Sequence, residues 1–247
     1  MTVRSLALEG CVNFRDLGGY RTADGNQVAW GRLFRADGLH RLSESDHDVL
    51  RGLGLRTVVD LRTIDEAVTR GSFPVGAVPV DYHAFPVTDV LPAVEELDAW
   101  AQASYVADRY LSMVTDGGPA LASAIGVLAG EDALPAVFHC SAGKDRTGVL
   151  SALVLGFVGV AGPVIVDDYA LSAPAMVNLM AQLELEYPHA VEEIRRHAPA
   201  ILTVVPETME LFLDRLFARF GSFTGVAEAL GVAGKLPALR DALVVPA

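Results

Sequence analysis

The sequence of 247 residues has few cysteines and few basic residues, and each shortage excludes a class of protein. Two cysteines, Cys11 and Cys140, are too few for a disulfide framework, so we expect a reducing compartment, although the sequence leaves open whether they pair. Lys and Arg number 19 against 31 Asp and Glu, a formal net charge of −12. Extended nucleic-acid binding requires clustered basic residues, so we expect no nucleic-acid partner. An anionic substrate must therefore meet a local positive pocket.

The sequence also lacks targeting and membrane segments. The first ten residues have no apolar run of the roughly 7–15 residues that a signal peptide needs, so we expect a cytoplasmic protein, with non-classical secretion left open. Residues 148–166 carry no charge, but Gly156, Gly159 and Pro163 interrupt them. A helix cut after about fourteen residues reaches only ~21 Å, against ~30 Å of hydrocarbon. We predict a buried core helix and no transmembrane segment.

The composition favours one domain over residues 1–247. Hydrophobic residues make up 51% of the chain and the mean hydropathy is +0.35, which excludes disorder and indicates a thick core. No repeat, low-complexity tract or flexible linker divides the sequence. The oligomeric state stays open.

Strand and helix patterns alternate in the first half of the chain. Residues 56–61 form a β-branched run fit for a central strand, and residues 78–83 form a further one. Between them, Thr63 and Glu66 form a capping-box pair that begins a helix. Strand, helix and strand in succession favour parallel pairing. We predict an α/β fold with a central, mostly parallel sheet flanked by helices, and a helical C-terminal third.

Other helices follow from capping and periodicity. A capping box from Ser43 to Asp46 begins a helix in which Val49, Leu50 and Leu53 face the core. Helical spacing also covers residues 94–114, 120–128, 163–171, 174–187, 191–197 and 207–220.

Residues 136–147 combine a short apolar run, a polar loop with glycine and the start of a long apolar helix. Such a turn gathers backbone N–H groups and the positive end of the helix dipole around one point, which suits a phosphate. Cys140 lies at the edge of this loop, where helix N-termini and cations favour the thiolate. Arg146 can grip two oxygens of an anion with its planar fork. The pattern predicts a cysteine nucleophile aimed at a phosphate ester.

The other loop residues have supporting roles in this hypothesis. The backbone of Ser141, Ala142 and Gly143 would bind the substrate oxygens, and Lys144 adds a second cation. Thr147 either hydrogen-bonds the sulfur or only caps the helix. His139 either orients the loop or is a satisfied histidine at a strand end.

The carboxyl ends of parallel strands meet at one edge, where ligands bind. Residues 60–62, the loop 84–91 and the loop after residue 139 should therefore lie together. Four earlier charges, Arg15, Asp16, Arg35 and Asp37, are either surface residues or a buried ion-pair lattice that ties the N-terminus to this edge.

The residues from His139 to Gly148, His-Cys-Ser-Ala-Gly-Lys-Asp-Arg-Thr-Gly, resemble the signature of the bacterial and fungal tyrosine phosphatases with an HCxxGKDRTG loop. The stretches 13–19 (NFRDLGG), 33–35 (LFR), 60–63 (DLRT) and 168–169 (DY) match further landmarks of that family in order. The resemblance implies a cysteine-phosphatase fold, no metal, no cofactor, and phosphotyrosine as substrate. Some members also take phosphoserine and phosphothreonine (dual specificity) or phosphoinositides. Lys144 is similar to a lysine that lipid-directed phosphatases use.

The general acid has two candidates. The chain lacks the Trp-Pro-Asp loop of the commoner tyrosine phosphatases, and Asp145 resembles the family residue proposed for this role. Asp89, in the loop after the strand at 78–83, is the positional alternative. Three functions remain open: a phosphatase acting on phosphorylated proteins, a phosphoinositide phosphatase with the same chemistry, and a pseudophosphatase that binds phosphorylated partners without turnover.

Overall fold

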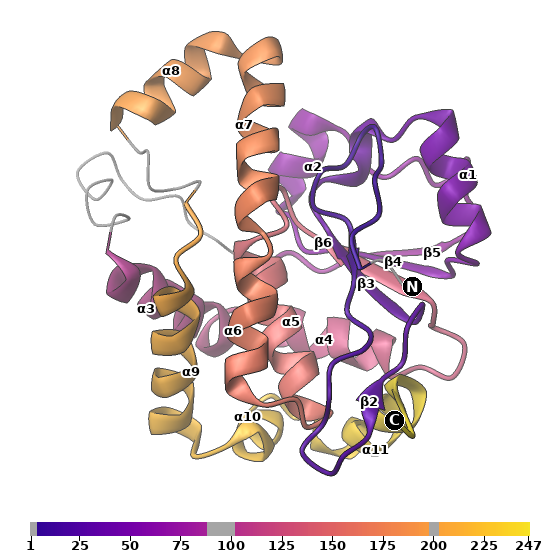
Figure 1. Cartoon of the computed structure of the whole chain (residues 1–247), viewed down its shortest axis with the longest axis vertical. Helices are drawn as coiled ribbons and strands as arrows, with labels where there is room; N and C mark the ends of the chain where they lie inside the picture. Colours follow the sequence, from indigo (N-terminus) through magenta and orange to yellow (C-terminus); the bar gives the residue numbers. More distant parts are fainter. Residues whose placement is uncertain (1–3, 88–101, 198–202) are drawn as a thin grey trace.

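The computed structural model describes residues 4–87, 102–197 and 203–247. Within these residues, five strands form the main sheet in the order β1-β3-β6-β4-β5 (Figure 1). Their bounds are Arg15–Asp16 (β1), Leu33–Ala36 (β3), Thr57–Asp60 (β4), Asp81–Ala84 (β5) and Ala136–His139 (β6). All neighbouring strands are parallel except β1, which runs antiparallel to β3 at the edge. The predicted mostly parallel sheet is confirmed, with β6 at its centre.

Both faces of this sheet are buried, as parallel sheets require. Because successive side chains point to opposite faces, Phe34, Val58 and Val137 join one hydrophobic cluster, and their neighbours Leu33, Val59 and Phe138 join the other. The first cluster is completed by the N-terminal segment and by Leu50 of α1 (Glu44–Gly52); Val49 of the same helix is exposed, so the prediction that it faces the core is wrong.

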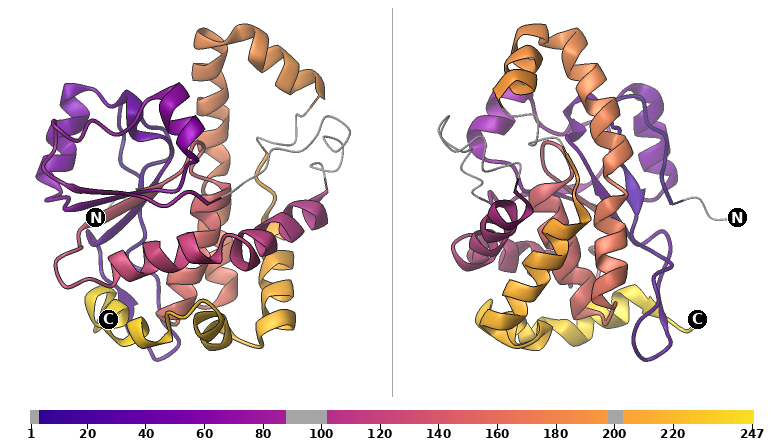
Figure 2. Two further views of the ribbon diagram at one scale, coloured as in Figure 1. Left: turned by 180° about the vertical axis from the view of Figure 1, so that it is seen from behind. Right: turned by 60° about the vertical axis from the view of Figure 1, so that its left-hand side comes forward.

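The helices that cover the second face come from the later part of the chain. They are α3 (Ala103–Thr115), α4 (Gly118–Leu128), α5 (Asp145–Phe157), α6 (Gly162–Ala170), α9 (Pro206–Phe220) and α10 (Phe223–Ala229). Helix α9 packs against α3 and α6 (Figure 2). Residues 88–101, which hold the start of the predicted helix 94–114, lie outside the described residues.

Helix α7 (Ala173–Glu186) runs beside the sheet and α8 (Pro188–His197) follows at its far end (Figure 1). The chain closes with α11 (Leu236–Leu243) and β7 (Val244–Val245), which pairs antiparallel with β2 (Gln27–Val28). This small second sheet joins the two ends of the chain, and the sequence patterns did not predict it.

Helix α5 is the core helix predicted from the uncharged stretch, and every residue from Arg146 to Phe157 is buried. It ends at Phe157 because Gly159 turns the chain with a positive φ of 95°, and α6 begins at Gly162. Among the described residues, no single helix is long and apolar enough to cross a membrane; the pair α3 and α4, bent by 69°, meets the criteria of length and composition together.

Candidate active site

The loop with the thiol lies between the central strand and the core helix. Strand β6 ends at His139, Cys140 follows, and α5 begins at Asp145, so the loop amides and the helix N-terminus face the carboxyl edge of the sheet. Asp60 and Ala84 end the parallel strands β4 and β5 at the same edge. The predicted convergence of these strand ends is confirmed for the described residues; Asp89 lies outside them.

Gly143 is required in the loop for two reasons. Its φ is +68°, a conformation that costs roughly 1–2 kcal/mol for a residue with a side chain. A Cβ at this position would also lie 2.6 Å from the Ala36 carbonyl oxygen and 2.7 Å from the Asp37 nitrogen. The loop therefore packs directly against the end of β3, and only glycine allows that approach.

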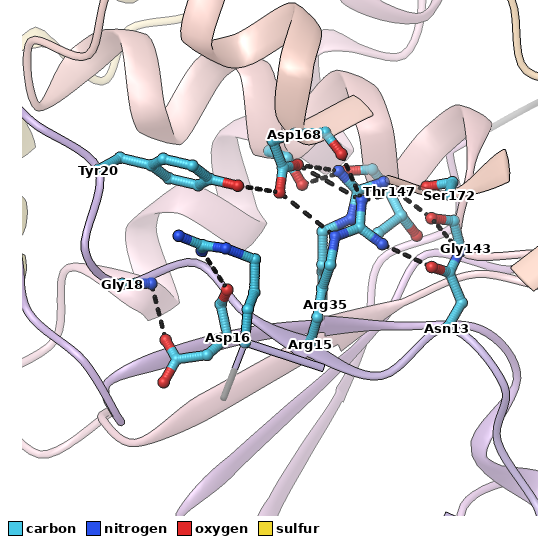
Figure 3. Close-up of polar contacts among 12 residues, drawn as sticks. Asn13, Arg15, Asp16, Gly18, Tyr20, Arg35, Gly143, Thr147, Asp168 and Ser172 are labelled. Carbon is cyan, nitrogen blue, oxygen red and sulfur yellow. Dashed lines mark hydrogen bonds and ion pairs between the residues drawn. The ribbon is translucent and has the colours of Figure 1, made fainter. Parts of the chain in front are cut away.

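The N-terminal segment binds three consecutive carbonyl groups of the loop. Figure 3 shows Asn13, Arg35 and Gly143 of this group. The Gly38 N–H donates to the Ser141 oxygen at 3.1 Å. The Asn13 amide donates to the oxygens of Ala142 at 3.1 Å and Gly143 at 3.2 Å, and Arg35 Nη2 donates to Gly143 at 2.8 Å. In a trans peptide the following N–H points opposite to the carbonyl. These bonds therefore aim the amides of residues 142–144 toward the front of the loop.

Arg15 and Arg35 converge on Asp168 of α6 (Figure 3). Arg35 Nη1 lies 2.6 Å and Arg15 Nε 3.3 Å from the carboxylate, and the Tyr20 hydroxyl donates to it at 2.9 Å. Burial alone would raise the pKa of Asp168, but the two guanidinium groups lower it to about 2. Burial and the charge of Arg15 lower the pKa of Arg35 to about 10. Arg35 and Asp168 are therefore both charged at neutral pH.

The four N-terminal charges are buried, but their partners differ from a simple lattice. Asp16 accepts hydrogen bonds from the N–H groups of Gly18 and Gly31 at 2.7 and 2.6 Å. Asp37 accepts from the N–H groups of Val12 and Asn13 and from the Cys11 thiol at 2.6 Å. The four charges are therefore buried, but they do not form an ion-pair lattice among themselves, because both arginines pair with Asp168. Both cysteines are free thiols.

Arg146 is fixed by Glu66 of α2 (Ile64–Arg70). Its Nη1 and Nη2 donate to the two carboxylate oxygens at 2.6 and 2.8 Å. Ser141 Oγ and the Thr63 N–H also donate to this carboxylate, at 2.6 and 2.9 Å. Burial acts to raise the pKa of Glu66, but these hydrogen bonds and the charge of Arg146 lower it below its usual range. The capping residue predicted from sequence thus also orients Arg146, the arginine predicted to bind the anion.

Lys144 and Asp145 lie at the start of α5. Lys144 is buried, and its Nζ donates to the Thr203 carbonyl at 3.0 Å and lies 3.4 Å from Asp145 Oδ1. Asp145 is partly exposed and accepts a hydrogen bond from the Tyr110 hydroxyl at 2.6 Å. The sequence predicts no role for Tyr110 beyond its place in the helical pattern of residues 94–114.

His139 and Thr147 are fully buried on either side of the loop. His139 Nδ1 lies 3.3 Å from the Cys140 oxygen, and its Nε2 lies 3.6 Å from Asp60. Burial lowers the pKa of His139 to about 4, so the ring is neutral at physiological pH. Thr147 Oγ1 has no hydrogen-bond partner among the described residues, so its contact with the sulfur stays a prediction. Within the residues that the structure describes, no three His, Cys, Asp or Glu side chains lie close enough together to hold a metal ion.

The fold and the loop define an α/β protein in which a loop with a thiol lies between the central strand and the N-terminus of the core helix. A sequence profile of the tyrosine phosphatase family matches residues 6–245, so the chain belongs to that family and is a hydrolase. The triple specificity protein phosphatase PtpB of Mycobacterium tuberculosis is 34% identical, and the match covers 74% of this chain and 74% of that protein. A putative tyrosine-protein phosphatase of Cupriavidus necator is 30% identical over 216 residues, 85% of this chain and 76% of that protein. The resemblance inferred from the loop is confirmed.

Among solved structures, the core catalytic domain of a PP-IP phosphatase from S. cerevisiae aligns with 63% of this chain and 74% of its own, at 12% identity and a TM-score of 0.37. We infer no substrate from that similarity.

Proposed function

We propose that the protein hydrolyses phosphate monoesters of tyrosine without a metal or cofactor, with Cys140 as the nucleophile. The observation that carries the proposal is the loop itself: a thiol at the N-terminus of α5, amides aimed forward by bound carbonyls, and a guanidinium held by Glu66. Such an arrangement stabilises the charge that spreads over the equatorial oxygens during phosphoryl transfer.

The proposed reaction has two displacements. The Cys140 thiolate attacks phosphorus, the bond to the leaving oxygen breaks, and Asp145 gives its proton to that oxygen. Water then attacks the phosphocysteine, and the Asp145 carboxylate takes a proton from this water. The sulfur–phosphorus bond breaks, phosphate leaves, and the thiolate and the protonated acid are restored. Asp89 remains the alternative acid.

Phosphoserine, phosphothreonine and phosphoinositides are further candidate substrates. The name of the mycobacterial relative includes triple specificity, which supports testing more than one class of phosphate ester. For phosphoinositides, Lys144 would have to leave the Thr203 carbonyl to meet a second phosphate. Tyrosine phosphate is therefore the first choice.

The test measures phosphate release from phosphotyrosine, phosphoserine and phosphothreonine peptides and from a phosphoinositide panel, with and without chelator. Cys140→Ser should abolish release from every substrate while leaving the unfolding curve intact, and chelator should have no effect. Turnover by Cys140→Ser would contradict the nucleophile. Tight phosphopeptide binding by the unmodified protein with no phosphate release would identify a pseudophosphatase instead.

A further inference from the structure

Among the residues that the structure describes, the contacts of the Asp145 side chain fall on one of its two carboxylate oxygens. The Tyr110 hydroxyl donates to Oδ1 at 2.6 Å, and Lys144 Nζ lies 3.4 Å from the same atom. The side chain is 16% exposed, so part of it is accessible to solvent. The bond from Tyr110 makes Oδ1 the acceptor oxygen and leaves Oδ2 as the oxygen that can carry a proton.

Tyr110 is held rigidly in the core. Its side chain is 0% exposed, and its ring makes edge contacts with Tyr169 of α6 and Phe212 of α9, with ring centroids 6.1 and 5.9 Å apart and interplanar angles of 77° and 80°. Three helices thus fix the position of one hydroxyl group.

While Asp145 is a carboxylate, the protons of this cluster have one consistent arrangement. The hydroxyls of Tyr110 and Tyr169 lie 2.9 Å apart. Burial, and the nearby charge of Asp145, raise the pKa of both tyrosines above the ordinary value, so each hydroxyl keeps its single proton at the pH of any assay. Because Tyr110 donates to Asp145, Tyr169 must donate to Tyr110. The two hydrogen bonds, from Tyr169 to Tyr110 and from Tyr110 to Asp145, are therefore both donated in the direction of the carboxylate.

Gly148 permits this arrangement. A Cβ on Gly148 would lie 3.2 Å from the Tyr169 ring, closer than most packed atoms. The glycine at the end of the signature loop therefore lets α6 bring Tyr169 against the first turn of α5.

We propose that Tyr110 is the positioning residue of the general acid: it binds Oδ1 of Asp145 so that Oδ2 presents the proton to the leaving oxygen of the substrate. This inference rests on the proposed function of Asp145. In the first displacement, the phosphorus–oxygen bond breaks, the Oδ2 proton passes to the leaving oxygen, and Asp145 becomes a carboxylate that Tyr110 still binds. The Tyr110 proton is not transferred.

The experiment compares kcat/KM, which reports the first displacement, over aryl phosphates from phenyl phosphate to 2,4-dinitrophenyl phosphate. A poor leaving group needs the proton and a good one does not. Asp145→Asn should lose roughly 10²–10⁴-fold on phenyl phosphate and little on the dinitrophenyl ester. Tyr110→Phe should steepen the dependence in the same way, with a loss of roughly 10-fold on phenyl phosphate. Tyr187→Phe, an exposed tyrosine at the end of α7, is the matched control and should leave every rate unchanged.

The double variant Tyr110→Phe with Asp145→Asn decides whether the two residues act together. Because Tyr110 acts through Asp145, the double variant should be no slower than Asp145→Asn alone. An equal loss by Tyr110→Phe on all leaving groups, or losses that multiply in the double variant, would overturn the role of Tyr110. If Asp145→Asn shows the same dependence of kcat/KM on the leaving group as the unmodified protein, Asp145 is not the general acid. The inference about Tyr110 then fails as well.

Tyr169→Phe gives an independent variant if Tyr110→Phe does not fold. It removes the hydroxyl that donates to Tyr110 and keeps the ring contacts, so we expect a smaller loss that again grows with the pKa of the leaving group. A loss that is uniform over the series would assign both tyrosines a packing role only.

Discussion

Arg35 Nη2 donates to the carbonyl oxygen of Gly143, 108 positions later in the chain, at 2.8 Å, while Nη1 of the same guanidinium binds Asp168 at 2.6 Å. One buried side chain therefore joins the ion-pair cluster to the loop that we propose binds phosphate (Figure 3). The planar fork matters because it addresses two acceptors at a fixed separation, which an ammonium group cannot do.

Arg35→Lys tests this link. We expect the charge next to Asp168 to remain, the bond to Gly143 to be lost, and kcat for p-nitrophenyl phosphate to fall roughly 10-fold or more, with a loss of about 1–3 kcal/mol in the free energy of unfolding. Steady-state kinetics and urea unfolding measure the two effects. Arg21→Lys, in the exposed hairpin, is the matched control. Full activity of Arg35→Lys would mean that Asn13 alone positions the Gly143 carbonyl.

Gly143→Ala tests the close packing of the loop against β3. The new methyl group would meet the Ala36 oxygen at 2.6 Å in a backbone with φ of +68°, so the loop must move. We expect a loss of activity of roughly 100-fold or more and a loss of stability above the ~1–2 kcal/mol of the backbone conformation alone. Gly25→Ala is the control, because its φ is +86° and no atom lies within 4 Å of the added Cβ. Gly25→Ala should lose only the backbone contribution and keep its activity; equal effects of the two would refute the packing argument.

The sequence predicted the parts of the site that are local in the chain. Cys140, Gly143 and Arg146 lie within one loop whose flanking strand and helix have strong patterns, so their convergence followed from spacing. The bond from Asn13 to Gly143 spans 130 positions and depends on which strand lies beside β6, which no local pattern encodes. Strand order decides such contacts, and strand order follows from packing of the whole chain.

For Glu66 and Tyr110, the sequence pattern predicts only one of the two structural roles of the side chain. Glu66 fits a capping box, and that pattern is the same whether or not the carboxylate also meets Arg146. Tyr110 fits an apolar helical stripe, because the ring is core while the hydroxyl finds Asp145 only after α3 packs on α5. The spacing of apolar residues predicts which face of a helix is buried. It does not predict what the polar group at the end of a buried side chain contacts.

Glu66→Gln tests the orientation of Arg146. The amide can accept from one nitrogen of the guanidinium but places its own N–H donors against the other, so the two-point contact is lost. We expect kcat/KM to fall about 10-fold, from the loss of one hydrogen bond between charged groups. Asp65→Asn removes the same charge from the exposed neighbouring position and should leave kcat/KM unchanged. A rise in kcat/KM for Glu66→Gln would mean that the carboxylate competes with the substrate for Arg146.

His139 predicts how stability depends on pH. The pKa of His139 is lowered by burial to about 4 in the folded protein, against about 6.5 in an unfolded chain. Asp60 favours the charged ring, and Arg62 and Arg146 oppose it. Between these two values the unfolded state binds more protons than the folded state. The contribution of His139 to the free energy of unfolding is therefore complete above a pH of about 6.5 and is lost as the pH falls toward about 4.

The expected loss is on the order of 3 kcal/mol across that window, because one pKa unit corresponds to about 1.4 kcal/mol. Burial also lowers the pKa of His40 to about 4, but this residue is only partly buried and should contribute less. Urea unfolding at several pH values would measure the slope for the unmodified protein, for His139→Gln and for His189→Gln, an exposed histidine on α8. The slope should flatten only in His139→Gln, since that variant removes the ring that must charge on unfolding. An unchanged slope in His139→Gln would assign the acid sensitivity to other groups.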